Sequence, residues 1–299
     1  MPAYMSHAIM MEKLYKDYVN DNKVFKNTLD INDLKTYSLG LDLSMTSLTL
    51  THNPHEEYTR DFFISMITYI KDNNLVNNNN VISLLYGHIA HYFLDVYAHP
   101  FIYYIEKSNK SNTIIPTHHL IEGYLDSYLS EKILKKDVMM LNEKYFNKGK
   151  IAKESLMLLN DIYYKIYHAK NIGFIYKRTL YLLSLLEKFI KYNHFSKKDL
   201  YRISGLKKFL NDNELSFIDL NNEKCLYYQN PVNGEYSRKS FLELFYLSIY
   251  KTLDAICEVN KYLYDNGQLE RLEKVFENLS YDTGLDCKYG HKMVYIKKK

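Results

Sequence analysis

Three of the eleven histidines and one aspartate lie within the segment Gly87-His88-Ile89-Ala90-His91-Tyr92-Phe93-Leu94-Asp95-Val96-Tyr97-Ala98-His99-Pro100. Successive residues of a helix are separated by about 100°, so these four polar side chains would fall within one stripe of the helix surface. Nitrogen and oxygen ligands on one face suit a borderline metal such as zinc. The segment therefore predicts a helix that binds a metal through His88, His91, Asp95 and His99. The alternative interpretation is a buried polar stripe whose histidines bond to backbone or tyrosine groups.

The rest of the chain also favours helices. Ten glycines and five prolines among 299 residues are few, which is typical of long helices rather than of many short strands. The sequence predicts helices over 7–19, 56–71, 81–98, 118–134, 150–170, 174–193 and 240–265, in several of which apolar residues recur at helical spacing, whereas 211–239 is expected to be irregular. Ser6 is expected to cap the first helix, and the helix over 81–98 is expected to end there, because Pro100 disfavours helical backbone at the residue before it. With no repeat, linker or change of composition, the sequence predicts a single all-α domain over residues 1–299.

Charge and cysteine content argue against several classes of protein. The net charge is +4, and the basic residues are spread along the chain, so the sequence lacks the basic patch of a nucleic-acid-binding protein. Three widely spaced cysteines, Cys225, Cys257 and Cys287, do not indicate a disulfide framework and fit a reducing compartment. The start of the chain does not resemble a signal peptide, and no apolar run is long enough to span a membrane. We expect a cytoplasmic location and no stable nucleic-acid partner, while transient contact with a membrane surface, secretion by way of a removed signal and the oligomeric state stay open.

A second group of metal-type side chains follows the first. His118 and Glu122 are separated by four residues, so they project from the same side of a helix, with Asp126 one turn further on. Isolated candidates earlier in the chain are His7, Asp42, His52 and His55. Taken singly, such histidines are most simply explained as surface or capping residues. Three further histidines have no metal-type neighbour at ligand spacing and are not candidates: His168, His194 and His291.

In their order and spacing, these motifs resemble the bacterial zinc-dependent phospholipases C. That family has an early His, an Asp, a His, a helix with H-x3-D, an HP dipeptide, and a helix with H-x3-E. The corresponding residues here are His7, Asp42, His55, His91-Tyr92-Phe93-Leu94-Asp95, His99-Pro100 and His118-His119-Leu120-Ile121-Glu122. Weaker similarities follow at Tyr228-Gln229-Asn230-Pro231 and Tyr281-Asp282-Thr283-Gly284-Leu285.

The resemblance implies an all-α domain with a three-zinc site at the bottom of a cleft. Carried over residue by residue, it implies that one zinc is held by Asp42, His55, His91 and Asp95. It implies a second zinc at His99, His118 and Glu122, and a third at His7 with a bridging oxygen of Asp95. His55 fits the family interval better than His52, and only His118, not His119, has the H-x3-E spacing. Both choices stay open at this point.

The sequence departs from the family pattern in three respects. Secreted relatives bind zinc through the amine of a mature N-terminal Trp, and this chain contains no Trp. We predict that His88 replaces that amine beside His7 and Asp95, the alternative being that His88 bonds a neighbouring helix. The interval from Asp95 to His99 is two residues shorter than in the toxins of the family. The additional membrane-binding domain of some toxins is not expected in a chain of this length.

The activity implied by the resemblance is hydrolysis of a phosphodiester. Clustered zinc ions bind phosphoryl oxygens and lower the pKa of bound water towards about 7. We therefore expect a hydrolase of the phospholipase C type, with two or three zinc ions, that acts on phospholipids or related phosphate esters through a zinc-activated water. Asp42 would orient or deprotonate that water. The alternatives are a zinc nuclease of related architecture and a non-catalytic metal-binding protein on the same scaffold.

Overall fold

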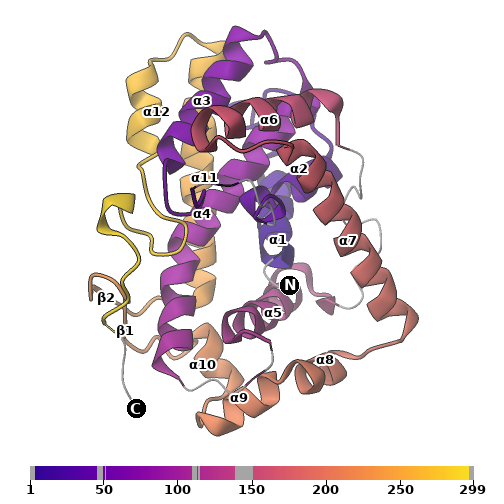
Figure 1. The fold of residues 1–299 in the computed structure, drawn as a ribbon, viewed down its shortest axis with the longest axis vertical. Coiled ribbons are helices and arrows are strands. Elements are labelled where there is room, and N and C mark those ends of the chain that lie inside the picture. The colour runs from indigo at the N-terminus through magenta and orange to yellow at the C-terminus, as the bar shows by residue number, and fades with distance from the viewer. Residues whose placement is uncertain are drawn as a thin grey trace.

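The chain folds almost entirely into helices (Figure 1), which confirms the all-α fold class. The computed structural model describes residues 4–45, 50, 52–109, 113, 115–138 and 151–295. Its α-helices are α1 (Tyr4–Tyr18), α2 (Ile31–Tyr37), α3 (Thr59–Asp72), α4 (Asn79–Ser108), α5 (Thr117–Leu129), α6 (Lys153–Tyr167), α7 (Ile172–Tyr192), α8 (Lys197–Ser204), α9 (Leu206–Asp212), α10 (Phe217–Asn221), α11 (Phe241–Tyr264) and α12 (Leu269–Val275). Shorter turns are η1 (Gly40–Leu43), η2 (Ser130–Leu134) and η4 (Cys287–Tyr289). Within the described ranges, the strands are β1 (Tyr228–Gln229) and β2 (Tyr236–Ser237), an antiparallel pair that pairs Tyr228 with Ser237.

Helix α4 is the central element of the fold. It spans 30 residues and is buried on all sides, as expected for a helix that is apolar around its whole circumference. Helices α2 and α11 pack against it most extensively, and α1, α3, α5 and α6 contact it as well (Figure 1). The first turn is capped by Asn78, whose side chain accepts hydrogen bonds from the backbone N–H groups of Asn80 and Val81. A polar stripe on α4 therefore lies inside the protein.

The prediction that this helix ends at Ala98 is wrong, because α4 continues through Pro100 to Ser108. Pro100 has no N–H to offer to the carbonyl of Val96 one turn earlier. Gly284 packs against this position with φ +65°, so closely that a Cβ there would lie 2.5 Å from the Val96 oxygen. Beyond the proline, Phe101, Ile102 and Ile105 are buried in the core. Tertiary packing thus outweighs the local preference of the proline.

The first helix also begins differently from the prediction. Helix α1 starts at Tyr4, so Ser6 lies within its first turn and is not its cap. The backbone N–H and the hydroxyl of Ser6 instead donate to Oδ1 of Asp126 on α5, at 2.8 and 2.5 Å. A carboxylate near a helix N-terminus is favourable because it satisfies free N–H groups and opposes the helix dipole. Asp126 therefore joins α1, which carries His7, to α5, which carries Glu122.

The remaining helices lie close to the expected ranges, and several short ones were not expected. Helix α3 begins at Thr59, and the expected helix over 118–134 divides into α5 and the π-helical turn η2. The irregular region 211–239 contains α10 and the β1–β2 hairpin. Among the described residues, no helix is long and apolar enough to cross a membrane.

Candidate metal centre

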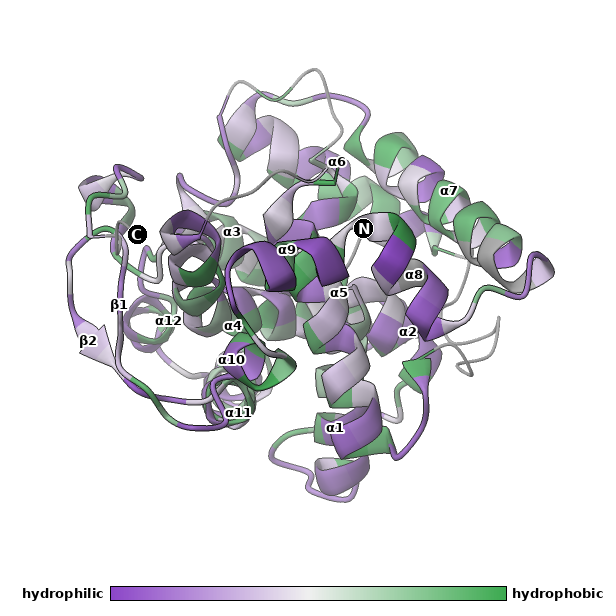
Figure 2. Cartoon of the chain, turned by 90° about the horizontal axis from the view of Figure 1, so that it is seen from below, coloured by the Kyte–Doolittle hydropathy of each residue, from purple (hydrophilic) through white to green (hydrophobic). Residues whose placement is uncertain are grey.

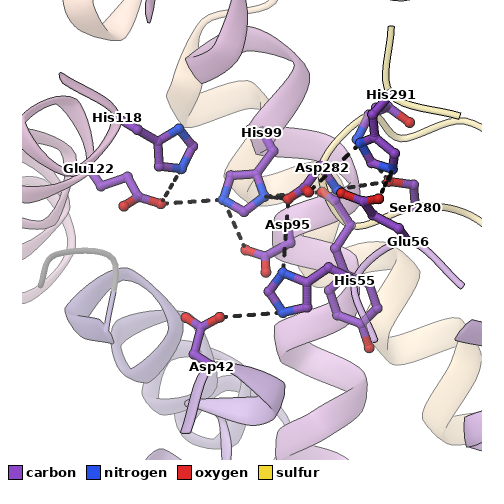
Figure 3. A network of polar contacts seen from close by, with 12 residues as sticks. Asp42, His55, Glu56, Asp95, His99, His118, Glu122, Ser280, Asp282 and His291 are labelled. Carbon is purple, nitrogen blue, oxygen red and sulfur yellow. Dashed lines mark hydrogen bonds and ion pairs between the residues drawn. The ribbon is translucent and has the colours of Figure 1, made fainter. Parts of the chain in front are cut away.

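Four side chains from three segments converge beside the middle of α4. His91 and Asp95 lie on successive turns of α4, Asp42 lies on η1, and His55 lies just before α3. Their ligand atoms are within 4.8 Å of one another. Nε2 of His91 is 3.2 Å from Oδ2 of Asp95. Nε2 of His55 is 3.4 Å from Oδ1 of Asp42 (Figure 3). We call this group the first cluster.

A glycine allows η1 to approach α4 closely enough to form the first cluster. Gly40 has φ +54°, a backbone conformation that favours glycine. A Cβ at Gly40 would lie 2.2 Å from a ring carbon of His91. Any side chain at this position would therefore collide with the imidazole. Gly40 places Asp42 beside the His91 ring.

A second cluster lies one turn further along α4. His99 faces His118 and Glu122 of α5, and the ligand atoms of the three residues are within 4.8 Å of one another. Oε1 of Glu122 is 3.3 Å from Nε2 of His99 and 3.1 Å from Nε2 of His118. Figure 3 shows His99 between Glu122 and the first cluster, so the two clusters are neighbours.

Asp95 connects the two clusters and also contacts α1. Its Oδ1 is 3.2 Å from Nε2 of His7 and 3.7 Å from Nε2 of His99, while its Oδ2 faces His91. The rings of His7 and His91 are 4.2 Å apart. Three imidazoles therefore surround one buried carboxylate. A small cavity is lined by residues of both clusters and by apolar side chains: Ser6, His7, Leu94, Asp95, Ala98, His99, Ile102, Glu122, Leu125 and Phe241.

The donor atoms of the first cluster fit a zinc ion. Nε2 of His55, both ring nitrogens of His91 and Oδ2 of Asp95 are buried and make no hydrogen bond within the described residues. A buried polar atom without a partner costs about 1–3 kcal/mol. Ligands at 2.0–2.2 Å from a tetrahedral zinc are separated from each other by roughly 3.3–3.6 Å, which is close to the distances found here. A zinc ion would bind three of these four atoms, Nε2 of His55, Nε2 of His91 and Oδ2 of Asp95, because an imidazole gives one nitrogen to an ion.

The electrostatics of the two clusters differ. Burial raises the pKa of Asp42 to about 6, against the opposing effect of His55. Burial lowers the pKa of His99, but Asp95 and Glu122 more than compensate and raise it to about 10. Burial also lowers the pKa of His118, but Glu122 outweighs burial and raises it to about 9. Without metal, the second cluster holds protons at neutral pH, and a bound cation would replace them.

The loop after α12 contributes outer contacts that the sequence did not identify as part of the site. The ring of Tyr281 stacks on His55 at 4.8 Å, and its N–H donates to the His55 carbonyl at 2.9 Å. The Tyr281 carbonyl accepts a hydrogen bond from Nδ1 of His99 at 3.1 Å. The carboxylate of Asp282 lies 3.9 Å from Nδ1 of His55 and 3.7 Å from Nδ1 of His99. Such contacts orient ligand histidines. The only sequence signal was the weak family similarity over 281–285.

A third group of charged residues lies outside the two clusters (Figure 3). Nε2 of His291 is 3.2 Å from Oε2 of Glu56, and Nδ1 of His291 is 3.9 Å from Oδ2 of Asp282. His291 was not a candidate, because no metal-type neighbour stands near it in the sequence. All three residues are only partly buried, and we interpret the group as an ion-pair network that holds the loop of Asp282 in place.

The structure distinguishes between the alternatives that the sequence left open. His52 pairs with Glu57, whereas His55 lies in the first cluster. His118 and His119 both approach Glu122, but the side chain of His119 is 47% exposed and only His118 lies beside His99, with ring centres 5.2 Å apart. The excluded histidines at 168 and 194 are exposed on the surface.

The structure does not bring His88 to His7 and Asp95. The His88 ring lies 6.0 Å from the ring of Phe62 and 6.1 Å from that of Tyr176, and its Nδ1 donates to the Leu84 carbonyl at 2.9 Å. Burial lowers the pKa of His88 to about 4. Seven residues along a helix correspond to roughly 10 Å, so His88 shares the stripe of Asp95 but lies at a different level. These surroundings are those of a core histidine.

Comparison with known proteins identifies one family. The family model described as zinc dependent phospholipase C matches residues 5–180. This range contains every candidate ligand from His7 to Glu122, whereas the loop with Tyr281 and Asp282 lies outside it. Comparisons with curated proteins and with solved structures returned no match.

Proposed function

The chain belongs to the zinc-dependent phospholipase C family, and we propose that it is a zinc-dependent phosphodiesterase of the phospholipase C type. The proposed substrate is a phospholipid or a related phosphate ester. The observation that carries the proposal is the pair of neighbouring clusters joined by Asp95, together with the ring nitrogens of His55 and His91 and the Asp95 oxygen that are buried and make no hydrogen bond within the described residues. A cytoplasmic location stays a prediction.

We propose two or three zinc ions per chain. The first cluster would hold one ion through Asp42, His55, His91 and Asp95. The second would hold another through His99, His118 and Glu122. His7 would complete a third position with Oδ1 of Asp95, from which its Nε2 is 3.2 Å. In this arrangement the two oxygens of Asp95 would bind different ions. This agrees with their surroundings, because Oδ1 faces His7 and His99 whereas Oδ2 faces His91.

We propose different roles for Asp42 and Asp95 in phosphodiester hydrolysis. The reaction requires neutralisation of the phosphoryl oxygens and a group that accepts the proton of the attacking water. Zinc, when bound, supplies the Lewis-acid neutralisation. The side chain of Asp42 is 26% exposed, against 4% for Asp95. We therefore propose that Asp42 accepts the proton and orients the water, and that Asp95 is a ligand only.

The proposal is tested by presenting three substrates to zinc-replete protein. These are phosphatidylcholine in detergent micelles, a chromogenic phosphodiester and single-stranded DNA. We expect turnover of the phospholipid or the chromogenic ester that disappears with a chelator and falls about 10²–10⁴-fold in Asp42→Asn. Asp286→Asn, at an exposed cap of η4, is the matched control and should keep full activity.

The other outcomes separate the alternatives. Cleavage of DNA alone would identify a zinc nuclease. No turnover of any of the three substrates by a zinc-replete sample would instead favour a metal-binding protein without this activity.

A further inference from the structure

Helix α7 has two apolar faces, and only one of them belongs to the core. On the buried face, Ile172, Tyr176 and Leu180 are covered, and Tyr176 contacts His88. The helix packs against α6 and against η1, the turn that carries Asp42. In both views α7 lies at the edge of the molecule (Figures 1 and 2).

The opposite face is a stripe of large apolar side chains that stay largely exposed to solvent. At about 100° per residue, one face of α7 contains five residues with exposed fractions between 42% and 84%. We call them the α7 stripe: Phe174, Tyr181, Leu185, Phe189 and Tyr192. Isolated exposed apolar residues are ordinary, but a contiguous row along one helix marks a binding surface.

The charge around the α7 stripe indicates what kind of surface it contacts. The sequence over 172–212 contains nine basic and three acidic residues, a balance of +6, although the whole chain carries only +4. On α7 itself, Lys177, Arg178 and Lys188 are exposed beside the stripe. An apolar helix face bordered by lysine and arginine is typical of helices that lie in the plane of a lipid–water interface, with the cations near anionic headgroups.

We propose that the α7 stripe docks on an anionic lipid surface. Its aromatic and leucine side chains enter the headgroup region, and the adjacent basic residues contact lipid phosphates. This inference rests on the proposed function for its purpose: docking would hold the protein at a surface made of lipid substrate, with α7 lying between that surface and η1. The docking itself requires no turnover.

The test is sedimentation with vesicles. Wild-type protein is mixed with vesicles of equal parts phosphatidylglycerol and phosphatidylcholine, or of phosphatidylcholine alone. We expect binding to the anionic vesicles that weakens at high salt. The double variant Tyr181→Ser/Phe189→Ser should bind at least about tenfold more weakly. Its matched control is Tyr250→Ser/Tyr289→Ser, with exposures of 60% and 62% against 59% and 58%, and this variant should bind like wild type.

A charge-reversal variant tests the second component of docking. Lys177→Glu/Lys188→Glu should lose the preference for anionic vesicles, because both side chains are exposed beside the stripe. The Tyr181→Ser/Phe189→Ser variant should hydrolyse the soluble chromogenic ester like wild type. If wild type and the variants bind anionic vesicles as expected but none of them, wild type included, hydrolyses a phosphodiester, the proposed function is wrong and the docking proposal stands.

Three results would overturn docking: no binding of wild type to anionic vesicles, equal binding by the stripe variant, or a dimer of wild type that the stripe variant converts to a monomer. The last result would show that a second copy of the chain covers the α7 stripe.

Discussion

Asp95 lies where the two clusters and α1 meet. It is buried on α4, and its two oxygens face histidines from α1 and from two turns of α4. Burial raises the pKa of its carboxyl, but His99, His91 and His7 outweigh burial and lower it. The residue therefore stays ionised inside the protein, where the compensating positive charge is either protons on imidazoles or a metal.

The second cluster makes metal binding depend on pH. Without metal, the pKa values of His99 and His118 are about 10 and about 9, above the ordinary value of 6.5. Their contribution to folding stability is thus fully present below pH 6.5 and is lost as the pH rises through 9–10. A zinc ion must displace these protons, so we expect affinity at this cluster to rise by up to about 100-fold per pH unit between pH 6 and pH 8.

Calorimetric titration of metal-free protein in buffers of different ionisation enthalpy measures the protons released by zinc. About two protons per ion are expected at the second cluster, and the exposed His168→Ala variant should release the same number. A zinc affinity that does not change over this pH range would contradict the assignment.

At the scale of elements, the site depends on close approaches of loops to α4. Gly40 brings η1 against the His91 ring, and Gly284 brings the loop of Tyr281 against the turn of α4 that contains Pro100. Both glycines have positive φ. Each approach places polar groups beside a ligand histidine: Asp42 near His91, and the Tyr281 carbonyl near His99.

Gly40→Ala should therefore damage the first cluster. Positive φ alone costs a non-glycine residue about 1–2 kcal/mol. The added methyl group would also displace the His91 ring, so we expect a loss of about 3 kcal/mol or more in the free energy of unfolding, together with a lower zinc content. Urea unfolding and elemental analysis measure the two effects.

Gly290→Ala is the control for backbone strain. Gly290 has φ +66°, and a Cβ there would meet nothing within 4 Å. With ψ −162°, Gly290 lies in a region that is almost restricted to glycine, so this variant should lose about 1–3 kcal/mol from backbone strain and keep its zinc. An equal loss of zinc in the two variants, or an unchanged zinc content in Gly40→Ala, would mean that the contact with His91 does not support the first cluster.

At the scale of the whole molecule, the two clusters connect segments that are far apart in the sequence. α1, η1, the segment before α3, α4 and α5 each provide at least one candidate ligand. A metal that binds only the folded arrangement adds its binding free energy to the stability of the fold. Metal removal should therefore lower the unfolding temperature of the entire chain.

Zinc content tests this linkage. The purified protein should contain two or more equivalents, and a chelator should lower its thermal midpoint. His91→Ala and Glu122→Ala, one from each cluster, should lose metal and stability, whereas the exposed variants His168→Ala and His194→Ala should resemble wild type. Less than one equivalent in wild type, with no thermal shift on adding zinc, would refute the site.

Local periodicity was sufficient to predict the long helices. Apolar spacing in α3, α7 and α11 reflects only the turn of the helix, so it can be read without knowing the partner helices. The same reasoning placed His91 beside Asp95 and His118 beside Glu122, because residues four apart on a helix are neighbours whatever surrounds them.

Features that depend on contacts between segments distant in the sequence were decided by the tertiary structure. The continuation of α4 through Pro100, the position of Ser6 inside α1 and the contacts of Tyr281 with two histidines all arise from packing between distant parts of the chain. His88 illustrates the difference well: its angle on the helix was predictable, but the level of the metal clusters along the axis was not. Spacing within one helix is set by backbone geometry, whereas contacts between segments are set by the packing of the whole core.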